Sequence, residues 1–330
     1  MFRALVTRKD ADGRISSAVE ALPEAALPAG DVLVAIEWTG LNYKDALCLA
    51  GRGGLVRSYP HVAGIDFAGR VLESGDDRYR SGQRVVLTGW HVGERRWGGF
   101  AERARVSGDW LVPLPHGLST REAMVLGTAG FTAMLAANRL KSDGLRPEQG
   151  EVLVTGASGG VGSIAVLLLS RLGHRVAAVT GRAELAERLT ALGAAAVLGR
   201  DEVITQSGKP LDHEQWAGAI DTVGGPMLAE VLKKLKRDGA VAALGNAGGV
   251  SFEGNVLPFI LRGVTLFGID SVLQPYAARV AAWDRLATLF VPGAYAPWVT
   301  EVPLAALPEA ATRILEGGVA GRIIVNPRRE

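Results

Sequence analysis

The chain has 330 residues, of which 48% are hydrophobic and 21% are charged, and its formal net charge is +2. This is the composition of a globular protein with one or two domains, and the charge balance argues against nucleic acid as a partner. The single cysteine excludes an intramolecular disulfide and a cysteine-rich structural zinc site. The first residues lack a signal-peptide pattern, and the longest apolar stretch, 164–169, is far shorter than a bilayer span. We therefore expect a cytoplasmic protein with no membrane partner.

Residues 1–120 have the pattern of a β-rich domain. Short β-branched runs bounded by Gly, Asp and Pro predict strands at 31–41, 68–75 and 83–89. The pattern changes near residue 120. A helix is predicted over 119–140, with Ser119 and Thr120 as candidate caps.

From residue 151 onward, predicted strands and helices alternate. The strands are predicted at 151–156, 174–181, 216–224 and 239–246. Helices are predicted at 162–173 and 183–193, and the segment that begins at Pro226 separates the last two strands. Alternation of this kind implies right-handed βαβ units and a parallel sheet with helices on both faces. Because the pattern is mixed again after about residue 265, this α/β domain is predicted to be inserted within the β-rich one.

A glycine-rich loop joins the first strand of this series to its helix. Residues 154–163 read VTGASGGVGS, with glycines at Gly156, Gly159, Gly160 and Gly162. The spacing GxxGGxG differs slightly from the commoner GxGxxG, but the physical reason is shared. Backbone N–H groups and the positive helix end face a pyrophosphate, and side chains would block its approach. The loop therefore predicts dinucleotide binding, and the alternative is a tight strand-to-helix turn without a ligand.

The end of the second strand of the series indicates which dinucleotide is bound. An NAD site usually has an Asp or Glu there to bind the ribose 2′-hydroxyl. This chain instead has Thr180, Gly181 and Arg182, and Arg200 follows the next predicted strand. A hydroxyl with guanidinium groups suits a 2′-phosphate and predicts NADPH. The alternative is that both arginines are solvated surface charges.

No metal site or covalent nucleophile is evident in the sequence. Cys48 lies on an apolar helical face, which is typical of a buried small side chain, and His61 and His91 lie in loops without ligands at zinc spacing. The pattern G-x-S-x-G of a nucleophile elbow occurs only as GASGG (156–160), within the glycine loop itself. Hydride transfer from a nicotinamide is the chemistry that remains.

The chain resembles the medium-chain dehydrogenase/reductases, and most closely their acryloyl-CoA reductase family. The resemblance rests on NYKDAL (42–47), PHVAGIDFAGRV (60–71), GWHVGERRWGGFAERARV (89–106), LGTAGFTAMLA (126–136), VTGASGGVGS (154–163), WAGAIDTVG (216–224) and GIDSV (268–272). It implies an α/β fold in which a Rossmann-type doubly wound parallel sheet domain, 126–266, is inserted in a β-rich GroES-like catalytic domain, 1–125 and 267–330.

The same resemblance implies a zinc-free member of the superfamily. The zinc alcohol dehydrogenases carry a Cys where this chain has LNYKD (41–45) and a GHE where it has GID (64–66). Both zinc ligands are thus replaced, and the four-cysteine structural lobe is absent.

Carried over by position, the resemblance implies four groups of site residues. Tyr43 would approach the nicotinamide and is the candidate catalytic residue. The pyrophosphate would be held by Ser158, Gly159, Gly160, Val161 and Gly162. The adenosine 2′-phosphate would be surrounded by Thr180, Gly181, Arg182 and Arg200. The nicotinamide end would be lined by Asn246, Ile260 and Ser271, although the family often has Leu where Asn246 stands.

The implied reaction is NADPH-dependent reduction of acryloyl-CoA to propanoyl-CoA, with Tyr43 or water as the proton donor. Candidate arginines for a CoA phosphate are found in RRW (95–97) and at Arg52, Arg57 and Arg322, and the sequence does not rank them. The alternatives are an NADPH-dependent quinone or enone oxidoreductase and a non-catalytic NADPH-binding sensor. A homodimer is expected, with the apolar run 263–269 as the candidate pairing strand.

Overall fold

The computed structural model describes residues 1–205 and 208–329, which form two compact units. Unit 1 comprises Met1–Thr128, Ser271–Thr288 and Pro297–Glu330. Unit 2 comprises Ala129–Asp270 and Leu289–Ala296. The predicted inserted domain, 126–266, lies almost wholly within unit 2.

Unit 2 is built on a six-stranded sheet in the order β11-β10-β9-β12-β13-β14, in which every pair of neighbours is parallel. Its strands are β9 (Val152–Val154), β10 (Val176–Val179), β11 (Ala194–Leu198), β12 (Trp216–Asp221), β13 (Leu235–Ala243) and β14 (Thr265–Gly268). Numbered within the unit, this is the order 3-2-1-4-5-6 of a doubly wound dinucleotide-binding fold. The predicted parallel sheet is confirmed.

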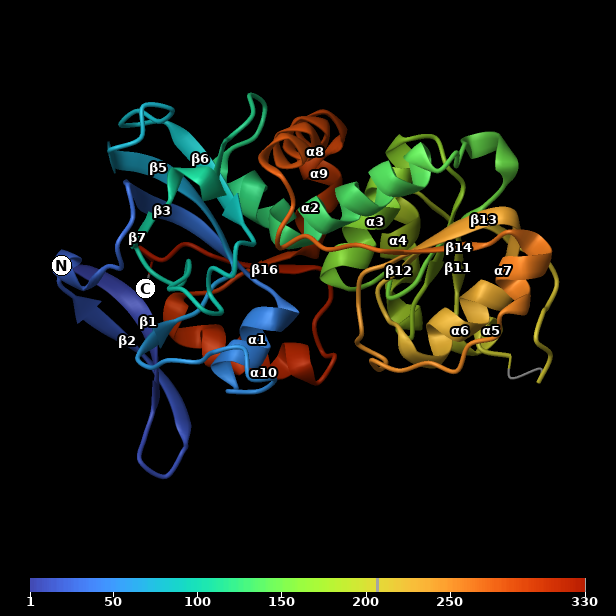
Figure 1. The fold of residues 1–330 in the computed structure, drawn as a ribbon, viewed down its shortest axis with the longest axis horizontal. Coiled ribbons are helices and arrows are strands. Elements are labelled where there is room, and N and C mark those ends of the chain that lie inside the picture. The colour runs from blue at the N-terminus through green and yellow to red at the C-terminus, as the bar shows by residue number, and fades with distance from the viewer. Residues whose placement is uncertain (206–207, 330) are drawn as a thin grey trace. The chain divides into compact units, whose positions relative to one another are not determined.

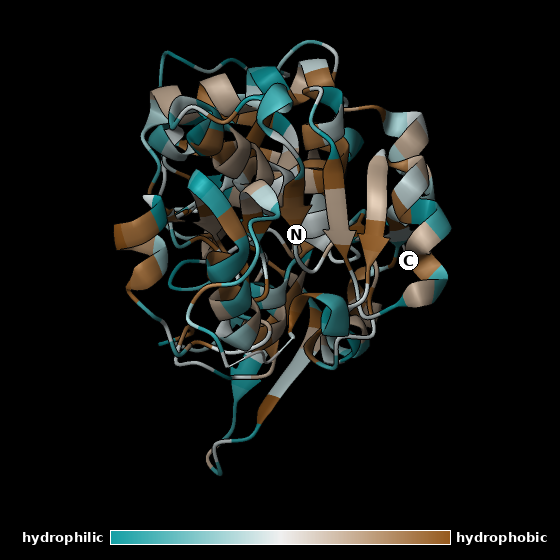
Figure 2. Cartoon of the chain, turned by 90° about the vertical axis from the view of Figure 1, so that its right-hand side faces the viewer, coloured by the Kyte–Doolittle hydropathy of each residue, from teal (hydrophilic) through white to brown (hydrophobic). Residues whose placement is uncertain are grey.

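Helices connect these strands (Figure 1). They are α3 (Gly160–Arg171), α4 (Ala186–Ala191), α5 (Arg200–Val203), α6 (Gly225–Lys234) and α7 (Leu257–Arg262), and α9 (Pro292–Tyr295) follows the last strand. Parallel neighbours need such crossovers because one strand must return to its starting edge before the next begins. All four residues of β10 and all six of β12 are buried, so the sheet carries the apolar core of the unit. In Figure 2, hydrophobic brown strands lie among helices and loops with teal residues.

Unit 1 contains two sheets. A three-stranded sheet has the order β2-β1-β4, and a seven-stranded sheet has the order β15-β16-β3-β5-β6-β8, with β7 also paired to β3. The strands are β1 (Phe2–Lys9), β2 (Ile15–Leu22), β3 (Val32–Leu41), β4 (His61–Val62), β5 (Asp66–Ser74), β6 (Arg84–Thr88), β7 (Arg103–Val106), β8 (Leu111–Pro113), β15 (Val299–Glu301) and β16 (Arg322–Val325). The β-rich character predicted for residues 1–120 is confirmed, and β3 is buried along nearly its whole length.

Three helices complete unit 1: α1 (Tyr43–Leu49), α8 (Tyr276–Leu289) and α10 (Leu307–Leu315). Helices α1 and α10 pack on each other, and their apolar residues share a core with β1 and β16. Short 3-10 helices lie at Glu24–Ala26, Gly108–Trp110, Pro147–Gln149, Ala183–Leu185, Ala296–Trp298 and Leu304–Ala306.

Helix α2 (Thr120–Ser142) carries the chain from unit 1 into unit 2. The sequence predicts one continuous helix here, but the backbone of Gly127 is not helical, with φ 51° and ψ −153°. Glycine is the residue that adopts such a conformation without a Cβ penalty, so the break occurs where the sequence allows it. Among the described residues, no helix is long and apolar enough to cross a membrane.

Candidate active site

The glycine loop of unit 2 runs from the end of β9 into α3. Gly156 has a φ of +59°, and a Cβ atom there would lie 2.2 Å from Oγ1 of Thr222. A Cβ atom at Gly162 would lie 2.3 Å from the carbonyl oxygen of Gly156. A side chain is excluded at both positions. Gly156 also has a left-handed backbone conformation, and at Gly162 the helix packs directly on the loop. No side chain therefore covers the backbone of the loop at these two glycines, next to the start of α3.

The first turn of α3 supplies backbone N–H groups from Gly160, Val161 and Gly162, which have no partner within the helix. Gly159 is the N-cap, and its carbonyl oxygen accepts a hydrogen bond of 2.6 Å from Oγ of Ser163. Because the helix dipole adds positive potential at this end, the turn is suited to a pyrophosphate.

Two arginines lie at the end of β10 and at the start of α5. Nη2 of Arg182 donates to Oγ of Ser158 at 2.9 Å, and Oγ1 of Thr180 donates to the same oxygen at 2.9 Å. A Cβ atom at Gly181 would lie 2.7 Å from Cζ of Arg200, so this guanidinium crosses the bare backbone of Gly181.

The electrostatics of this pair favour an anion. Burial lowers the pKa of Arg182, Glu184 opposes this shift, and the positive charge of Arg200 lowers the pKa further. A bound anion between two neighbouring guanidinium groups would offset their repulsion. The structure thus brings Ser158, Thr180 and both arginines together in an arrangement that fits a 2′-phosphate.

Asp221, the last residue of β12, is a buried carboxylate that the sequence analysis did not single out. It accepts hydrogen bonds from Oγ1 of Thr155 at 2.6 Å and from the backbone N–H of Gly224 at 2.8 Å. Burial raises the pKa of Asp221, whereas these hydrogen bonds lower it. Asp221 therefore ties the loop after β12 to the strand that leads into the glycine loop. The available signal was an acidic residue at the end of an apolar strand.

Asn246 and Ile260 lie in different surroundings within unit 2. Asn246 is exposed just after β13, where Gly248 donates to the carbonyl oxygen of Val223 at 2.7 Å. It therefore shares the carboxyl edge of the sheet with the glycine loop. Ile260 lies on α7 with 68% of its surface exposed. The roles of both residues at the nicotinamide end stay predictions.

Tyr43 and Ser271 belong to unit 1. Tyr43 is the first residue of α1 and is 44% exposed. The carbonyl oxygen of Ser271 accepts a hydrogen bond of 3.3 Å from Nη2 of the buried Arg279. The same guanidinium donates to the carbonyl oxygen of Val272 at 2.6 Å, so the backbone at Ser271 is held firmly.

Asn42, the N-cap of α1, belongs to a buried polar cluster. The other members of the cluster are Asp45, Asp66 and Arg322. Asp45 and Asp66 have no exposed surface. Burial, and then the charge of Asp66, raises the pKa of Asp45 to about 7. We refer to these four residues as the Asn42 cluster.

Comparison with known proteins decides the family. The family described as Alcohol dehydrogenase GroES-like domain matches residues 28–116, and the one described as Zinc-binding dehydrogenase matches residues 160–287. The acrylyl-CoA reductase AcuI of Ruegeria pomeroyi is 53% identical over 327 residues, covering 99% of both chains. The chain belongs to the acryloyl-CoA reductase family of the medium-chain dehydrogenase/reductases. The resemblance inferred from the sequence and the combination of a GroES-like domain with a Rossmann-type sheet are confirmed.

Two further relatives of this chain have names that mention a cofactor or a substrate class. The yhdH oxidoreductase from Salmonella enterica, solved in complex with NADP, is 52% identical with a TM-score of 0.96, covering 99% of this chain and 100% of that one. The putative quinone oxidoreductase YhfP of Bacillus subtilis is 46% identical over 326 residues, covering 98% of each chain.

The described residues of this family member contain no group of three or more His, Cys, Asp or Glu side chains placed to hold a metal ion. Cys48 is buried as predicted, and burial raises the pKa of its thiol. Nε2 of His61 lies 2.9 Å from the carbonyl oxygen of Gly93, and Nδ1 of His91 lies 3.6 Å from Oε2 of Glu94.

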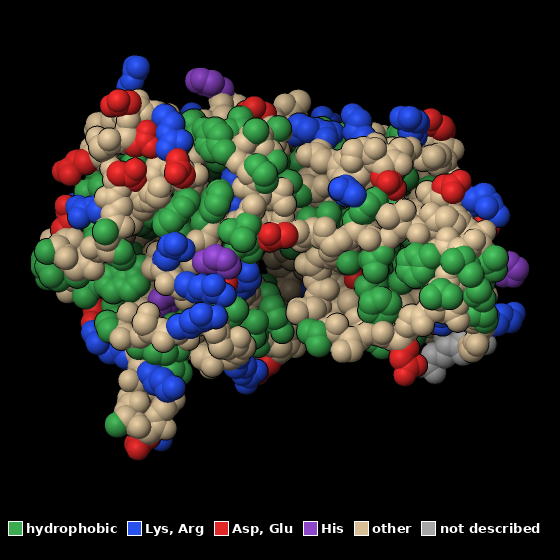
Figure 3. Space-filling view, viewed as in Figure 1, with side chains coloured by type: hydrophobic (Ala, Val, Ile, Leu, Met, Phe, Trp, Pro, Cys, Tyr) green, Lys and Arg blue, Asp and Glu red, His purple; other side chains and the backbone are tan. Residues whose placement is uncertain are grey.

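The arginines considered for a CoA phosphate differ in exposure. Arg322 is only 3% exposed and donates to Oδ1 of Asn42 at 2.9 Å. Its candidacy is therefore wrong, because a buried guanidinium bound within the protein cannot also meet a phosphate at the surface. The remaining candidates are exposed: Arg52, Arg57, Arg95 and Arg96. On one face of unit 1, Figure 3 shows Lys and Arg side chains gathered beside a histidine.

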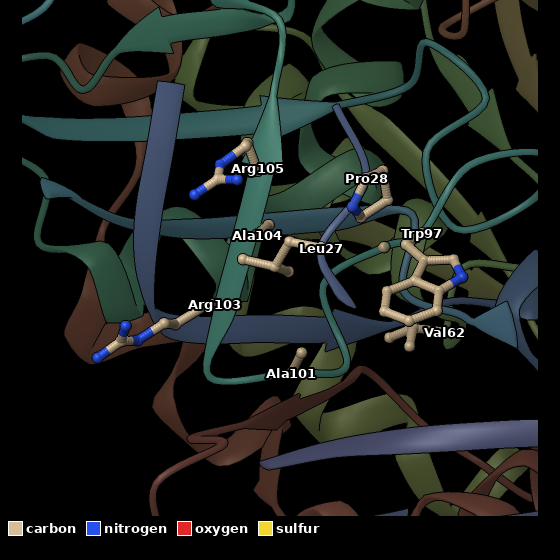
Figure 4. A pocket seen from close by; sticks show the side chains of 9 residues that line it. Leu27, Pro28, Val62, Trp97, Ala101, Arg103, Ala104 and Arg105 are labelled. Atoms are coloured by element: carbon tan, nitrogen blue, oxygen red, sulfur yellow. The ribbon is translucent and has the colours of Figure 1, made fainter. Parts of the chain in front are cut away.

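Unit 1 also contains a small pocket. Its volume is about 10 Å³, room for about one water molecule. Leu27, Val62 and Trp97 are among its lining side chains, and Arg103 and Arg105 point outward beside it (Figure 4). It is too small for a cofactor or an acyl group.

Proposed function

We propose that this protein reduces acryloyl-CoA to propanoyl-CoA with NADPH. The observation that carries the proposal is the 53% identity, over nearly the whole chain, to the acrylyl-CoA reductase of Ruegeria pomeroyi. In this reaction the β-carbon of the enoyl thioester gains a hydride and the α-carbon gains a proton, and NADPH becomes NADP⁺. The bound cofactor supplies the hydride, and the protein supplies binding, orientation and electrostatic stabilisation.

The phosphate groups of NADPH would be held by residues of unit 2. Ser158 and Gly159, with the backbone N–H groups of Gly160, Val161 and Gly162, would bind the pyrophosphate. Thr180, Gly181, Arg182 and Arg200 would bind the adenosine 2′-phosphate. The bare loop at Gly156 and Gly162 and the two adjacent guanidinium groups support this assignment. Asn246, Ile260 and Ser271 are the proposed residues at the nicotinamide end.

Tyr43 is the proposed catalytic residue. Addition of hydride to the β-carbon leaves an enolate on the thioester, and hydrogen-bond donors near its oxygen stabilise that charge. The exposed position of Tyr43 at the start of α1 supports contact of its hydroxyl with bound ligands. The proton for the α-carbon comes from Tyr43 or from water.

The test is a steady-state assay of NADPH oxidation with acryloyl-CoA, crotonyl-CoA, a quinone and free acrylate. A three-carbon acyl group offers little apolar surface, so the CoA portion must supply most of the binding energy that orients the reacting carbon. We expect kcat/KM for acryloyl-CoA to exceed that for acrylate by several orders of magnitude. Equal or better reduction of acrylate would contradict the thioester assignment.

A quinone oxidoreductase is the second candidate, and the 46% identity to the putative quinone oxidoreductase YhfP favours it. High activity on the quinone beside low activity on CoA thioesters would establish it. Tight NADPH binding without turnover on any of these acceptors would instead indicate a sensor.

We also propose that the reaction needs no zinc. The stretches LNYKD (41–45) and GID (64–66) support this, because the first lacks the Cys of the zinc alcohol dehydrogenases and the second has Ile65 in place of the His of their GHE. Exhaustive chelation is expected to leave kcat unchanged. Loss of activity that zinc restores would overturn the proposal.

A cytoplasmic homodimer completes the proposal, with domains at 1–125 with 267–330 and at 126–266. Strand β14 lies at the edge of the unit 2 sheet, and Leu261 on the adjacent α7 is 51% exposed. An open edge strand beside exposed apolar side chains is suited to pairing with a second copy. Light scattering should give twice the chain mass, and Leu261→Glu should shift it toward the monomer. A monomeric wild type would contradict this.

A further inference from the structure

The Asn42 cluster takes no part in the phosphate binding proposed for unit 2. We propose that Asn42 is a positioning residue: Asp45, Asp66 and Arg322 hold it, and it fixes the start of α1 and thereby Tyr43. The inference rests on the proposed function, because it takes Tyr43 as the residue that meets the substrate.

Asn42 uses every polar group of its side chain within the cluster. Its Nδ2 donates to Oδ2 of Asp45 and to Oδ2 of Asp66, each at 3.0 Å, and its Oδ1 accepts from Nη1 of Arg322 at 2.9 Å. Its backbone N–H also donates to Oδ2 of Asp45 at 2.9 Å. A side-chain amide offers two donors and an acceptor together, whereas a carboxylate offers acceptors alone. Asparagine is therefore suited to lie between two carboxylates and a guanidinium.

The two carboxylates are themselves anchored to the backbone. Oδ1 of Asp45 accepts from the N–H groups of Ile65 at 2.8 Å and Gly64 at 3.2 Å. Oδ1 of Asp66 accepts from the N–H of Gly40 at 3.1 Å. Gly40 belongs to β3, Gly64 and Ile65 form the segment before β5, and Asp66 is the first residue of β5, so neither carboxylate can move away from Asn42 without breaking these hydrogen bonds.

Arg322 and Asp66 also hold the break in α2. Nε of Arg322 donates to the carbonyl oxygen of Val125 at 3.1 Å, before the break, and Oδ2 of Asp66 accepts from the N–H of Thr128 at 2.7 Å, after it. The guanidinium of Arg322 thus lies at the C-terminal end of the helical segment before the break, and the carboxylate of Asp66 lies at the N-terminal end of the segment after it. Each charge has the sign that the helix dipole favours at that end. A Cβ atom at Gly127 would lie 2.7 Å from both side chains, so the break has no room for one.

The position of Tyr43 depends on this cluster because Tyr43 is the first residue of α1 and directly follows Asn42. Tyr43 is 44% exposed. Asp45 lies in the first turn of α1, and its Oδ2 accepts from both the backbone N–H and Nδ2 of Asn42. If Asn42 loses its partners, this turn frays and the Tyr43 hydroxyl moves. Displacement of a reacting group by about 1 Å can cost about a hundredfold in rate.

The test is a double-mutant cycle of Asn42→Asp and Tyr43→Phe. Asn42→Asp removes both side-chain donors and adds a third carboxylate at nearly constant volume. We expect it to lower kcat at least about tenfold in the wild type and less than about twofold in the Tyr43→Phe background, since residues that act as a unit are non-additive. KM for NADPH should stay unchanged in both. Equal losses in the two backgrounds, or no loss in either, would overturn the proposal.

Asn326→Asp is the matched control, because Asn326 caps the N–H of Arg328 near the chain's end and contacts no member of the Asn42 cluster through a hydrogen bond that the structure describes. It should leave kcat unchanged. If Asn42→Asp fails to fold, Arg322→Lys replaces it in the cycle with the same expected pattern. If the enzyme reduces a quinone and not acryloyl-CoA, the proposed function fails while the cycle is still measured with the quinone.

A readout without turnover completes the test. The chain has five tyrosines, so 3-fluorotyrosine labelling gives few ¹⁹F resonances, and Tyr43→Phe assigns the one from Tyr43. Asn42→Asp should shift or broaden that resonance, and Asn326→Asp should not. An unchanged Tyr43 resonance in Asn42→Asp would overturn the proposal whatever the substrate is.

Discussion

The glycine loop of unit 2 and the Asn42 cluster of unit 1 are assembled from the chain in opposite ways. The loop consists of consecutive residues, 154–163, and its form follows from glycines at fixed spacing. The cluster joins Asn42 to Arg322, which are 280 positions apart. A local motif reveals its chemistry in the sequence, whereas a cluster built from distant segments shows its chemistry only after folding. The loop should therefore respond to substitutions mainly in cofactor binding, and the cluster mainly in stability and in the placement of Tyr43.

The largest effect is expected for Asp66→Ala, which removes the acceptor of Nδ2 of Asn42 and of the backbone N–H groups of Gly40 and Thr128. Breaking a buried charged network of this kind costs about 3–5 kcal/mol in the free energy of unfolding. Glu20→Ala is the control, because Glu20 pairs with Arg8 at 2.9 Å on the surface. Surface pairs contribute about 0–1 kcal/mol. Urea unfolding of the three proteins measures both losses, and similar losses would contradict the distinction between buried and exposed charges.

Arg182→Ala should act on cofactor choice and leave stability nearly unchanged. A charged hydrogen bond contributes about 1.5–3 kcal/mol, so NADPH binding should weaken about ten- to a hundredfold while NADH binding stays nearly constant. Arg175→Ala is the matched control, since Arg175 pairs with Glu151 beyond the opposite end of β10 and should affect neither cofactor. Calorimetric titration with each cofactor measures this. Equal losses for NADPH and NADH would assign Arg182 a structural role instead.

Gly162→Ala tests whether the glycine loop depends on close packing. The new Cβ would lie 2.3 Å from the carbonyl oxygen of Gly156, and such overpacking costs about 1–3 kcal/mol. Both the melting temperature and NADPH affinity should fall. A Cβ at Gly293 would meet nothing within 4 Å, so Gly293→Ala should leave both unchanged. If Gly162→Ala behaves like this control, the bare loop is not a packing requirement.

A pH dependence of stability is also expected to originate in the Asn42 cluster. Burial, and then Asp66, raises the pKa of Asp45 from 3.8 to about 7, so the folded state retains a proton that the unfolded chain releases. Its contribution to stability is complete below about pH 4 and is lost as pH rises through the folded value. The free energy of unfolding should therefore fall more steeply across this window in the wild type than in Asp45→Asn. Urea unfolding at a series of pH values checks the slope, and parallel curves would contradict it.

Much of unit 2 could be predicted because its signals are local. Alternating apolar runs and amphipathic segments predicted the parallel sheet, and the absence of an acid at Thr180, Gly181 and Arg182 indicated NADPH. Asp221 was missed because its role depends on Thr155 and Gly224, which meet it only when β9 and β12 pair. The break at Gly127 was missed because helix periodicity continues through it.

The sequence by itself determined the fold class and the position of the glycine loop, because periodicity and glycine spacing act over a few neighbouring residues, and its motifs carried the resemblance to the family. Only the tertiary structure decided that Arg322 is a buried partner of Asn42 and no candidate for a CoA phosphate. An arginine near the end of a chain is most often solvated. Here its guanidinium is enclosed because β16 pairs with β3 beside α1, which brings the carbonyl oxygens of α2 and the amide of Asn42 within hydrogen-bond distance. A buried charge needs such partners, and only the folded chain can bring them together.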